Sequence, residues 1–267
     1  MIRLNLQEDT SFEKLPVSVY ANPEEASIVV ASRIADIIRK KQLSGERAVL
    51  GLATGDTPIR VYKELIRLHK EEGLSFKNVV SFNLDEYYPM LPDAEQSYVS
   101  FMYNNLFNHI DIDKDNIYIP DGTLAVEDIP SYCIAYEERI TELGGIDLQL
   151  LGIGRTGHIG FNEPGSGPST DTRLVTLEDL TREDASSSFG GKENVPHQAI
   201  TMGIGTVLRA KEIVLIAWGE KKGEIVQKAV EGEMSSDVPS TFLQQSNNVE
   251  FILDEGAAFK LTRFATR

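Results

Sequence analysis

The chain has 267 residues, 41% of them hydrophobic, which is enough for a sizeable core and suits one α/β domain with embellishments. Lysine and arginine number 26 against 41 aspartates and glutamates, so the formal net charge is -15. A field of this sign repels polyanions, which argues against nucleic acid and anionic membranes as partners. It also repels phosphorylated metabolites at long range, so any phosphate site has to be built locally from backbone N–H groups and a few cations.

The single cysteine, Cys133, lies in a segment that the pattern predicts to be helical, and we expect a buried thiol. One cysteine forms no disulfide within the chain, which favours a reducing compartment. The first fifteen residues lack the continuous apolar core of a secretory signal, and no run elsewhere approaches membrane-spanning length. We therefore expect a soluble, cytoplasmic protein.

The first predicted helix begins at residue 23. Asn22 supplies a capping side chain, Pro23 suits the first helical position, and two glutamates follow near the positive end of the helix dipole. Apolar residues then recur at helical spacing and predict one buried face, formed by Val30, Ile34, Ile37 and Ile38.

An apolar run at 48–53 predicts a strand buried on both sides. It leads into a turn in which Thr57 is expected to cap a second helix that Pro58 begins and that continues through His69. The same pattern predicts an aromatic-rich helix at 97–108 and further strands at 79–82, 147–153, 212–218 and 249–253.

Apolar strands that alternate with helices predict an α/β fold: an open, mostly parallel, twisted, Rossmann-like sheet with helices on both faces. Residues 165–196 are polar and predict a surface segment, for which a mobile lid and a static exposed loop fit the composition equally. We see no linker or repeat and expect a single domain over 1–267. Ligands bind beyond the carboxyl ends of the strands in such sheets, so the residues after each strand are the candidates for a site.

After the strand at 48–53, the turn of Thr54, Gly55, Asp56 and Thr57 precedes a helix, where free N–H groups and the helix dipole can cradle a phosphate. Many α/β turns of this kind bind nothing. Asp56 would repel a phosphate unless its side chain points outward.

After the strand at 79–82, two adjacent carboxylates, Asp85 and Glu86, stand where a general base would be placed. Alternation along an extended chain puts them on opposite faces, so only one can face a cleft. A solvated or capping role for both is the alternative.

After the strand at 147–153 comes a glycine-rich loop with His158, and Glu163 follows within reach of the imidazole as an orienting carboxylate. After the strand at 212–218, Lys222 is either a phosphate-binding cation or a solvated surface lysine. Four histidines without helical metal spacing and one cysteine predict no metal site.

Together these segments resemble the glucosamine-6-phosphate deaminase (isomerase) family over about residues 18–264. The most specific stretch is GHIGFNEPGS at 157–166; related 6-phosphogluconolactonases share a glycine–histidine loop but not its FNEP continuation. Three further stretches are similar to the family: SFNLDEYYPM at 81–90, SYVSFMYNNLF at 97–107 and VPHQAITMGIGTVL at 195–208.

The resemblance implies deamination of glucosamine 6-phosphate, an amino-sugar phosphate, to fructose 6-phosphate and ammonia, with no cofactor and no metal. Asp85 would be the general base that moves a proton between C2 and C1 of the open-chain sugar. His158, held by Glu163, would serve the ring oxygen in opening the pyranose. The 6-phosphate would be held by Thr54, Gly55, Thr57 and Lys222.

The chain departs from the family pattern at several positions. Thr156 stands where many members carry an acid, so Glu163 alone or the threonine hydroxyl would have to orient His158. The run at 185–188 lacks an arginine that contacts the phosphate in many members, and Arg173 or Arg182 could substitute. Val175 replaces a lysine of the allosteric members, which argues against activation by N-acetylglucosamine 6-phosphate and the associated hexamer. Whether the chain forms a homo-oligomer stays open.

Three other functions compete with this interpretation. The same chemistry on galactosamine 6-phosphate is one, because sequence does not separate the C4 epimers. A sugar-phosphate sensor without efficient chemistry is the second, motivated by Thr156 and Ser187. Hydrolysis of 6-phosphogluconolactone is the third and is disfavoured by the FNEP stretch.

Overall fold

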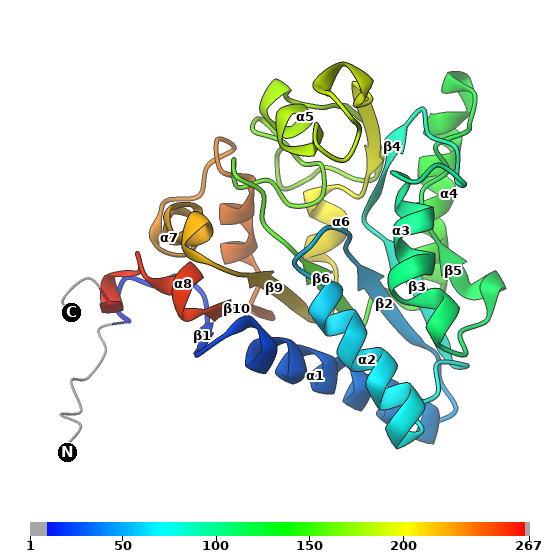
Figure 1. Ribbon diagram of the computed structural model, residues 1–267, viewed down its shortest axis with the longest axis horizontal. Helices are drawn as coiled ribbons and strands as arrows, with labels where there is room; N and C mark the ends of the chain where they lie inside the picture. Colours follow the sequence, from blue (N-terminus) through cyan, green and yellow to red (C-terminus); the bar gives the residue numbers. More distant parts are fainter. Residues whose placement is uncertain (1–9, 265–267) are drawn as a thin grey trace.

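The computed structural model describes residues 10–264. A parallel sheet of seven strands lies at the centre of this structure (Figure 1). Its strand order is β1-β10-β9-β6-β2-β3-β5. The strands are β1 (Val17–Tyr20), β2 (Ala48–Leu52), β3 (Val79–Asn83), β5 (Ile117–Tyr118), β6 (Leu148–Leu151), β9 (Ile213–Ala217) and β10 (Val249–Asp254). The predicted open, parallel α/β sheet is confirmed.

Helices cover both faces of this sheet because the central strands are apolar on both sides. Alternate residues of one strand enter different cores: Leu50 packs with α1 and α2, whereas Val49 packs on the opposite face with α4 and α7. The helices are α1 (Pro23–Leu43), α2 (Ile59–Glu72), α3 (Tyr98–Asn105), α4 (Ile129–Glu142), α5 (Asp179–Ala185), α6 (Ile204–Leu208), α7 (Gly223–Glu231) and α8 (Glu255–Ala258). Among the described residues, no helix is both long and apolar enough to cross a bilayer.

The start of α1 agrees with the sequence prediction, and that of α2 does not. The Asn22 side chain accepts a hydrogen bond from the Glu25 amide at 2.9 Å. Helix α2 begins at Ile59, with Pro58 in the capping position and no side-chain cap, so the predicted cap by Thr57 is wrong. Thr57 lines a cavity instead.

Helix α3 begins after Ser97, whose side chain accepts from the Ser100 amide, and it ends at Asn105 rather than at residue 108. A turn of 3-10 helix at Phe107–His109 follows. The predicted strands at 147–153 and 212–218 are each shorter, because their outer residues already belong to the loops at the sheet edges.

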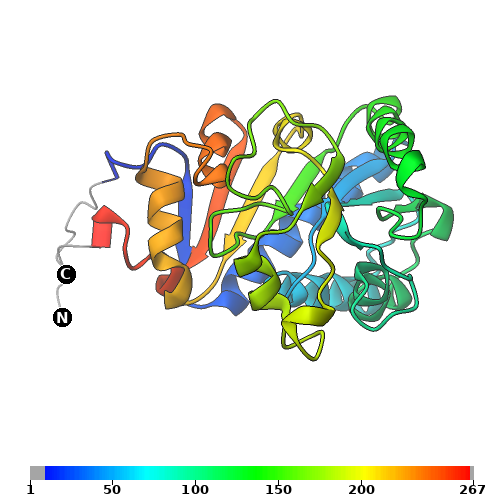
Figure 2. The ribbon, with the colours of Figure 1, turned by 90° about the horizontal axis from the view of Figure 1, so that it is seen from above.

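A second sheet, antiparallel and absent from the sequence prediction, stands over the carboxyl ends of the first. It consists of β4 (Asp85–Tyr88), β8 (Gln198–Thr201) and β7 (Arg173–Thr176), in that order. The polar segment 165–196 supplies β7 and α5, so it is not a plain exposed loop. Figure 2 looks down on this segment, which crosses above the middle of the large sheet.

Gly51 sets the spacing of two central strands. It lies opposite Gln149 of β6, and a Cβ atom at this position would come within 2.0 Å of the Gln149 amide oxygen. Both residues are buried, so the side chain has no room to move aside.

We therefore expect Gly51→Ala to lower the free energy of unfolding by about 1–3 kcal/mol through overpacking. Urea denaturation followed by circular dichroism measures this change. Gly167→Ala is the control, since a Cβ atom there meets nothing within 4 Å. Equal stability of the two variants would contradict the expectation.

Candidate active site

A cavity of about 160 Å³ opens at the carboxyl ends of β2, β3 and β6. Loops from different parts of the sequence meet there because parallel neighbouring strands end at the same sheet edge. Its lining consists of Ala53, Thr54, Thr57, Leu84, Asp85, Tyr98, Gly152, Ile153, Gly154, His158, Gly160 and Phe161. The structure thus brings together the carboxylate, the imidazole and the phosphate-cradle threonines that the sequence singled out.

Asp85 is the buried carboxylate of this cavity. It begins β4 opposite Thr201 of β8, and 5% of its surface is exposed. Burial, and secondarily the neighbouring charge of Glu86, raises the pKa of Asp85 to about 8. Gly160, at φ +56°, passes close by, since a Cβ atom there would lie 3.3 Å from Asp85 Oδ2. Asp85 is therefore a carboxyl group poised to exchange a proton near neutral pH.

Glu86 faces the opposite side of β4, as the alternation of the chain predicts. Its carboxylate accepts hydrogen bonds from the backbone amide of Tyr87 in β4 and from those of Tyr98 and Val99 at the start of α3. Burial raises the pKa of Glu86 to about 7, although these three amides favour the ionised form. Glu86 anchors α3, and Asp85 is the carboxylate that faces the cavity.

His158 is held through its Nδ1 atom. The Thr156 hydroxyl oxygen lies 3.0 Å from Nδ1 with hydrogen-bond geometry, and Glu163 Oε2 lies 3.2 Å away. Neither oxygen of Glu163 has a hydrogen-bond partner with good geometry among the described residues, so its contact with His158 is an ion pair and not a hydrogen bond. Both candidate partners thus contact the same ring nitrogen. A Cβ atom on Gly154 would lie 2.0 Å from His158 Nε2, so only glycine lets the ring occupy this place.

Glu163 is a buried carboxylate that keeps its charge. Burial by itself would raise its pKa, but the contacts with His158, assisted by Thr181 and the Glu178 backbone, bring the pKa of Glu163 below its usual value. An ionised Glu163 beside Nδ1 also fixes the orientation of the imidazole ring.

The cradle at 54–57 lies at the cavity, but Gly55 and Lys222 are not among the lining residues. Thr54 and Thr57 line it, and Gly55 turns with φ +97°, a conformation that favours glycine. Lys222 Nζ donates to the Ile153 carbonyl at 2.7 Å, so this lysine points at the glycine-rich loop. Burial lowers the pKa of Lys222, which the charge of Asp184 opposes and that of Arg155 assists.

Arg173 and Arg182, the two arginines considered as substitutes at the phosphate, lie elsewhere. Arg182 is buried and donates to the carbonyls of Val195 and Lys192, which fastens α5 to the end of the polar segment. Arg173 donates to Asn162 Oδ1 at 2.9 Å and to the Ser166 hydroxyl at 3.2 Å. Neither placement supports a phosphate contact.

Sequence reasoning overlooked Tyr98 and Phe161 as cavity-lining residues. Both fall in stretches that resemble the family, but an aromatic residue in an apolar pattern gives no signal that separates a cavity wall from a core. Tyr98 follows the capping Ser97, so the first turn of α3 presents it to the cavity.

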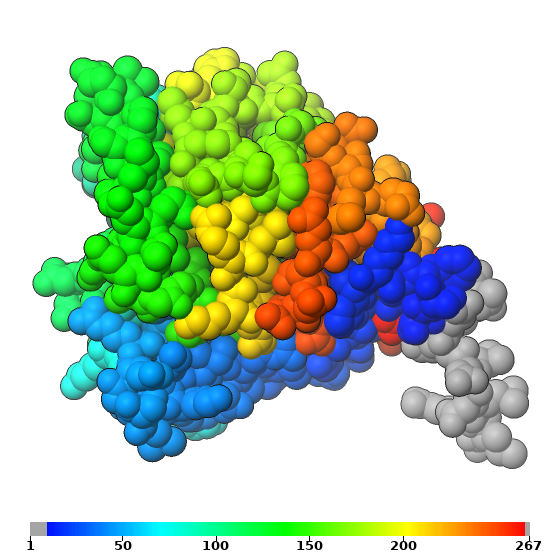
Figure 3. Space-filling model, turned by 180° about the vertical axis from the view of Figure 1, so that it is seen from behind, coloured from blue at the N-terminus to red at the C-terminus, as the bar shows by residue number. Residues whose placement is uncertain are grey.

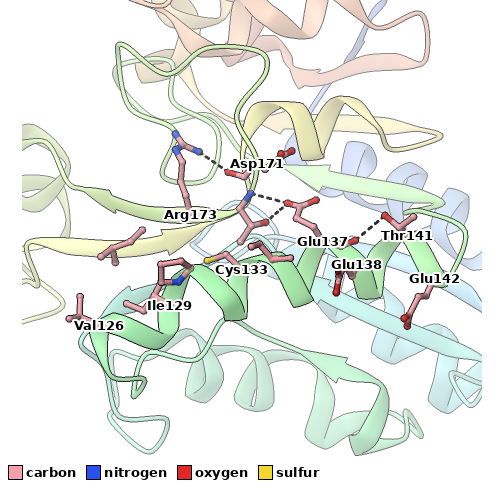
Figure 4. Close-up of a pocket in the computed structure, with 13 residues that line it drawn as sticks. Val126, Ile129, Cys133, Glu137, Glu138, Thr141, Glu142, Asp171 and Arg173 are labelled. Carbon is pink, nitrogen blue, oxygen red and sulfur yellow. Dashed lines mark hydrogen bonds between the residues drawn. The ribbon is translucent and has the colours of Figure 1, made fainter.

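A larger cavity, of about 1020 Å³, lies along the outer face of α4 and contains neither Asp85 nor His158 (Figure 4). There Glu137 accepts hydrogen bonds from Thr172, Thr206 and Arg209, which ties α4 to the start of β7 and to α6. Figure 3 shows this side of the molecule, with α4 in green beside the yellow-green and yellow surface of the following segments. Cys133 is buried in α4 as predicted, and burial raises its thiol pKa to about 11. These residues stabilise the fold and offer no catalytic pair.

Among residues 10–264, no group of three histidine, cysteine, aspartate or glutamate side chains is arranged to hold a metal ion. The cavity offers a carboxyl group and an imidazole, which can move protons, and Lys222, which contacts the lining residue Ile153, is a cation that can bind an anion.

The burial of Asp85 predicts a pH-dependent stability. The pKa of Asp85 is about 8 in the folded chain, against 3.8 for an exposed aspartate. Between pH 4 and pH 8 the unfolded chain ionises this residue and the folded chain does not, so the resulting loss of stability grows as the pH rises. We expect Asp85→Asn to raise the melting temperature, with a larger gain at pH 8 than at pH 5. Calorimetry measures this, with the exposed Asp93→Asn as control. A gain independent of pH would contradict it.

Comparison with known proteins identifies the family of this chain. Residues 21–252 match the family model for glucosamine-6-phosphate isomerases and 6-phosphogluconolactonases. A glucosamine-6-phosphate deaminase of Clostridium perfringens is 47% identical over 240 residues, which cover 90% of this chain and 97% of that protein. A deaminase-like protein of Bacteroides thetaiotaomicron is 48% identical over 95% of this chain, which spans only 38% of that longer relative.

Solved structures show the same fold. A monomeric glucosamine-6-phosphate deaminase superposes with a TM-score of 0.87 at 42% identity, over 92% of this chain and 100% of that chain. A 6-phosphogluconolactonase of Trypanosoma brucei superposes with a TM-score of 0.74 at 22% identity, over 94% and 100%, and shares the fold. The resemblance seen in the sequence is confirmed: the chain belongs to the glucosamine-6-phosphate deaminase (isomerase) family.

Proposed function

We propose that this chain converts glucosamine 6-phosphate and water to fructose 6-phosphate and ammonia. The observation that carries the proposal is the meeting of Asp85 and His158, from loops more than seventy residues apart, in the lining of one cavity. The identity to several deaminases supports the same activity.

Binding would place the 6-phosphate at Thr54 and Thr57, with Gly55 between them and with Lys222 on the side of Ile153. Backbone N–H groups before α2 and one lysine offset the repulsion of the net charge. The sugar ring then lies toward Asp85 and His158, because those residues line the rest of the same cavity.

His158 opens the ring by proton transfer. Its Nδ1 atom is engaged by Thr156 and Glu163, so Nε2 is the nitrogen that exchanges a proton with the substrate. It relays the proton of the C1 hydroxyl to the ring oxygen, which breaks the C1–O5 bond and leaves an open-chain aldehyde. The ionised Glu163 stabilises the imidazolium that forms on the way.

Asp85 then moves a proton from C2 to C1 as the general base. Loss of the C2 proton gives an enolamine, and return of the proton to C1 gives an imine at C2. Water adds to that imine, and departure of ammonia from the carbinolamine leaves the ketose. The raised pKa of Asp85 suits this role, since a base of high pKa takes up a carbon-bound proton more readily than an exposed aspartate does.

The decisive experiment incubates the chain with glucosamine 6-phosphate, galactosamine 6-phosphate and 6-phosphogluconolactone, and measures ammonia release from the two aminosugar phosphates and acid release from the lactone. We expect ammonia and fructose 6-phosphate from the first, and kcat/KM that rises with pH toward about 8 as Asp85 loses its proton. Asp85→Asn should lower kcat by about 10²–10⁴-fold, the usual contribution of a general base. Asp93→Asn should leave it unchanged.

Three outcomes would contradict the proposal. Release of ammonia from no aminosugar phosphate at any concentration would leave a binding protein. Hydrolysis of the lactone alone would assign the other activity that shares this fold. Full activity of Asp85→Asn would remove the base from the mechanism.

Thr156 is expected to position His158. Thr156→Val keeps the shape but removes the hydroxyl that contacts Nδ1, so kcat should fall by about three- to tenfold, the worth of one neutral hydrogen bond. Thr156→Ser restores the hydroxyl and should restore the rate. The pH dependence of kcat should shift in the valine variant and not in the serine variant. An unchanged rate and pH profile for Thr156→Val would show that Glu163 suffices.

A further inference from the structure

The phosphate end of the cavity contains little positive charge for a molecule of net charge -15. Lys222 is the cation proposed to bind the phosphate there. Arg182 is occupied by backbone carbonyls and Arg173 by Asn162 and Ser166. A phosphate dianion would still be incompletely neutralised by one lysine and the amides before α2.

Arg155 lies next to this end of the cavity. It follows Gly154 directly and is two residues from Ile153, whose carbonyl accepts from Lys222. Its guanidinium is close enough to Lys222 for its charge to lower the pKa of that lysine. The glycine-rich loop therefore holds a second, long and cationic side chain beside the first.

In the structure Arg155 forms an ion pair with Asp184 of α5, with 2.9 Å between the guanidinium and the carboxylate. The side chains are 55% and 47% exposed, and an ion pair as exposed as this contributes little net stability. Asp184 also lies near Lys222, since its charge acts on the pKa of that lysine. The carboxylate therefore stands beside two cations, Arg155 and Lys222.

We propose that Arg155 is a second phosphate-binding residue, which Asp184 holds in the ligand-free protein and which transfers to the phosphate of a bound sugar phosphate. The proposal rests on the proposed function for the identity of the ligand. A guanidinium binds phosphate through two parallel hydrogen bonds, which a phosphate dianion accepts more strongly than an exposed carboxylate does. Asp184 then opposes phosphate binding, both by competing for Arg155 and by repelling the dianion.

This arrangement gives the two partners opposite effects, which a purely structural ion pair would not. Removing Arg155 takes a cation from the phosphate. Removing the charge of Asp184 frees that cation. If the pair only fastened α5 to the glycine-rich loop, either change would have the same consequence.

The test compares Arg155→Ala, Asp184→Asn and the control Arg39→Ala. Arg39 is 43% exposed and stands 3.7 Å and 3.8 Å from two acids, Asp36 and Glu72. It lies near the end of α1, which leads into the start of β2 and so to the edge of the sheet away from the cavity. Calorimetric titration with inorganic phosphate, and with glucosamine 6-phosphate in an Asp85→Asn background that turns it over slowly, gives the dissociation constants, and steady-state kinetics without the Asp85 change gives KM and kcat.

We expect Arg155→Ala to raise the dissociation constants of both ligands and KM by about tenfold or more, the loss of one charge-assisted contact, with a smaller effect on kcat. Asp184→Asn should lower the same constants severalfold, and Arg39→Ala should leave them unchanged. Unchanged phosphate affinity in Arg155→Ala, or a loss of affinity in Asp184→Asn as large as in Arg155→Ala, would overturn the proposal.

Failure of the proposed function is distinguishable from failure of this inference. If the wild-type chain releases no ammonia but the two variants shift phosphate affinity in opposite directions, the phosphate role of Arg155 stands and the activity does not. If ammonia is released and the variants bind phosphate as the wild type does, the activity stands and the role of Arg155 does not.

Discussion

The parallel pairing of β6, β2 and β3 is the constraint on which the site depends. Because these neighbouring strands run in the same direction, the turn after Leu52, the residues after Asn83 and the loop after Leu151 all emerge at one edge. Each loop supplies one kind of chemistry: amides and threonines, a carboxyl group, and an imidazole. Disturbing the spacing of these strands would therefore disturb all three at once.

The small antiparallel sheet stands over these loops and buries part of the site. Pairing of β4 with β8 buries Asp85 away from water and places the Glu86 carboxylate against the amides at the start of α3. Two adjacent carboxylates are buried together as a result, and the pKa of each is raised. This burial costs stability, and it also makes Asp85 a stronger base than a carboxyl group in water.

The surroundings of His158 show how a changed residue can be compensated locally. Thr156 places a neutral oxygen where many members of the family place an acid, and Glu163 remains ionised nearby. The imidazole keeps a contact on Nδ1 but has one negative charge fewer beside it. Arg155, the residue before Thr156, brings a cation to the same loop and pairs with Asp184.

The sequence by itself determined five of the seven strands of the large sheet and the starts of α1 and α3, and it singled out Asp85 and His158, because apolar periodicity, caps and loop motifs are local signals that survive without tertiary contacts. It missed β4, β7 and β8, since short strands of mixed polarity acquire their pairing only from residues far away, such as Thr201 opposite Asp85. It misjudged Thr57 as a cap and offered Arg173 and Arg182 for a phosphate. Only the tertiary structure decided which charges are buried, which are already paired and which face one cavity, because those properties depend on groups brought together by folding and not on their neighbours in the chain.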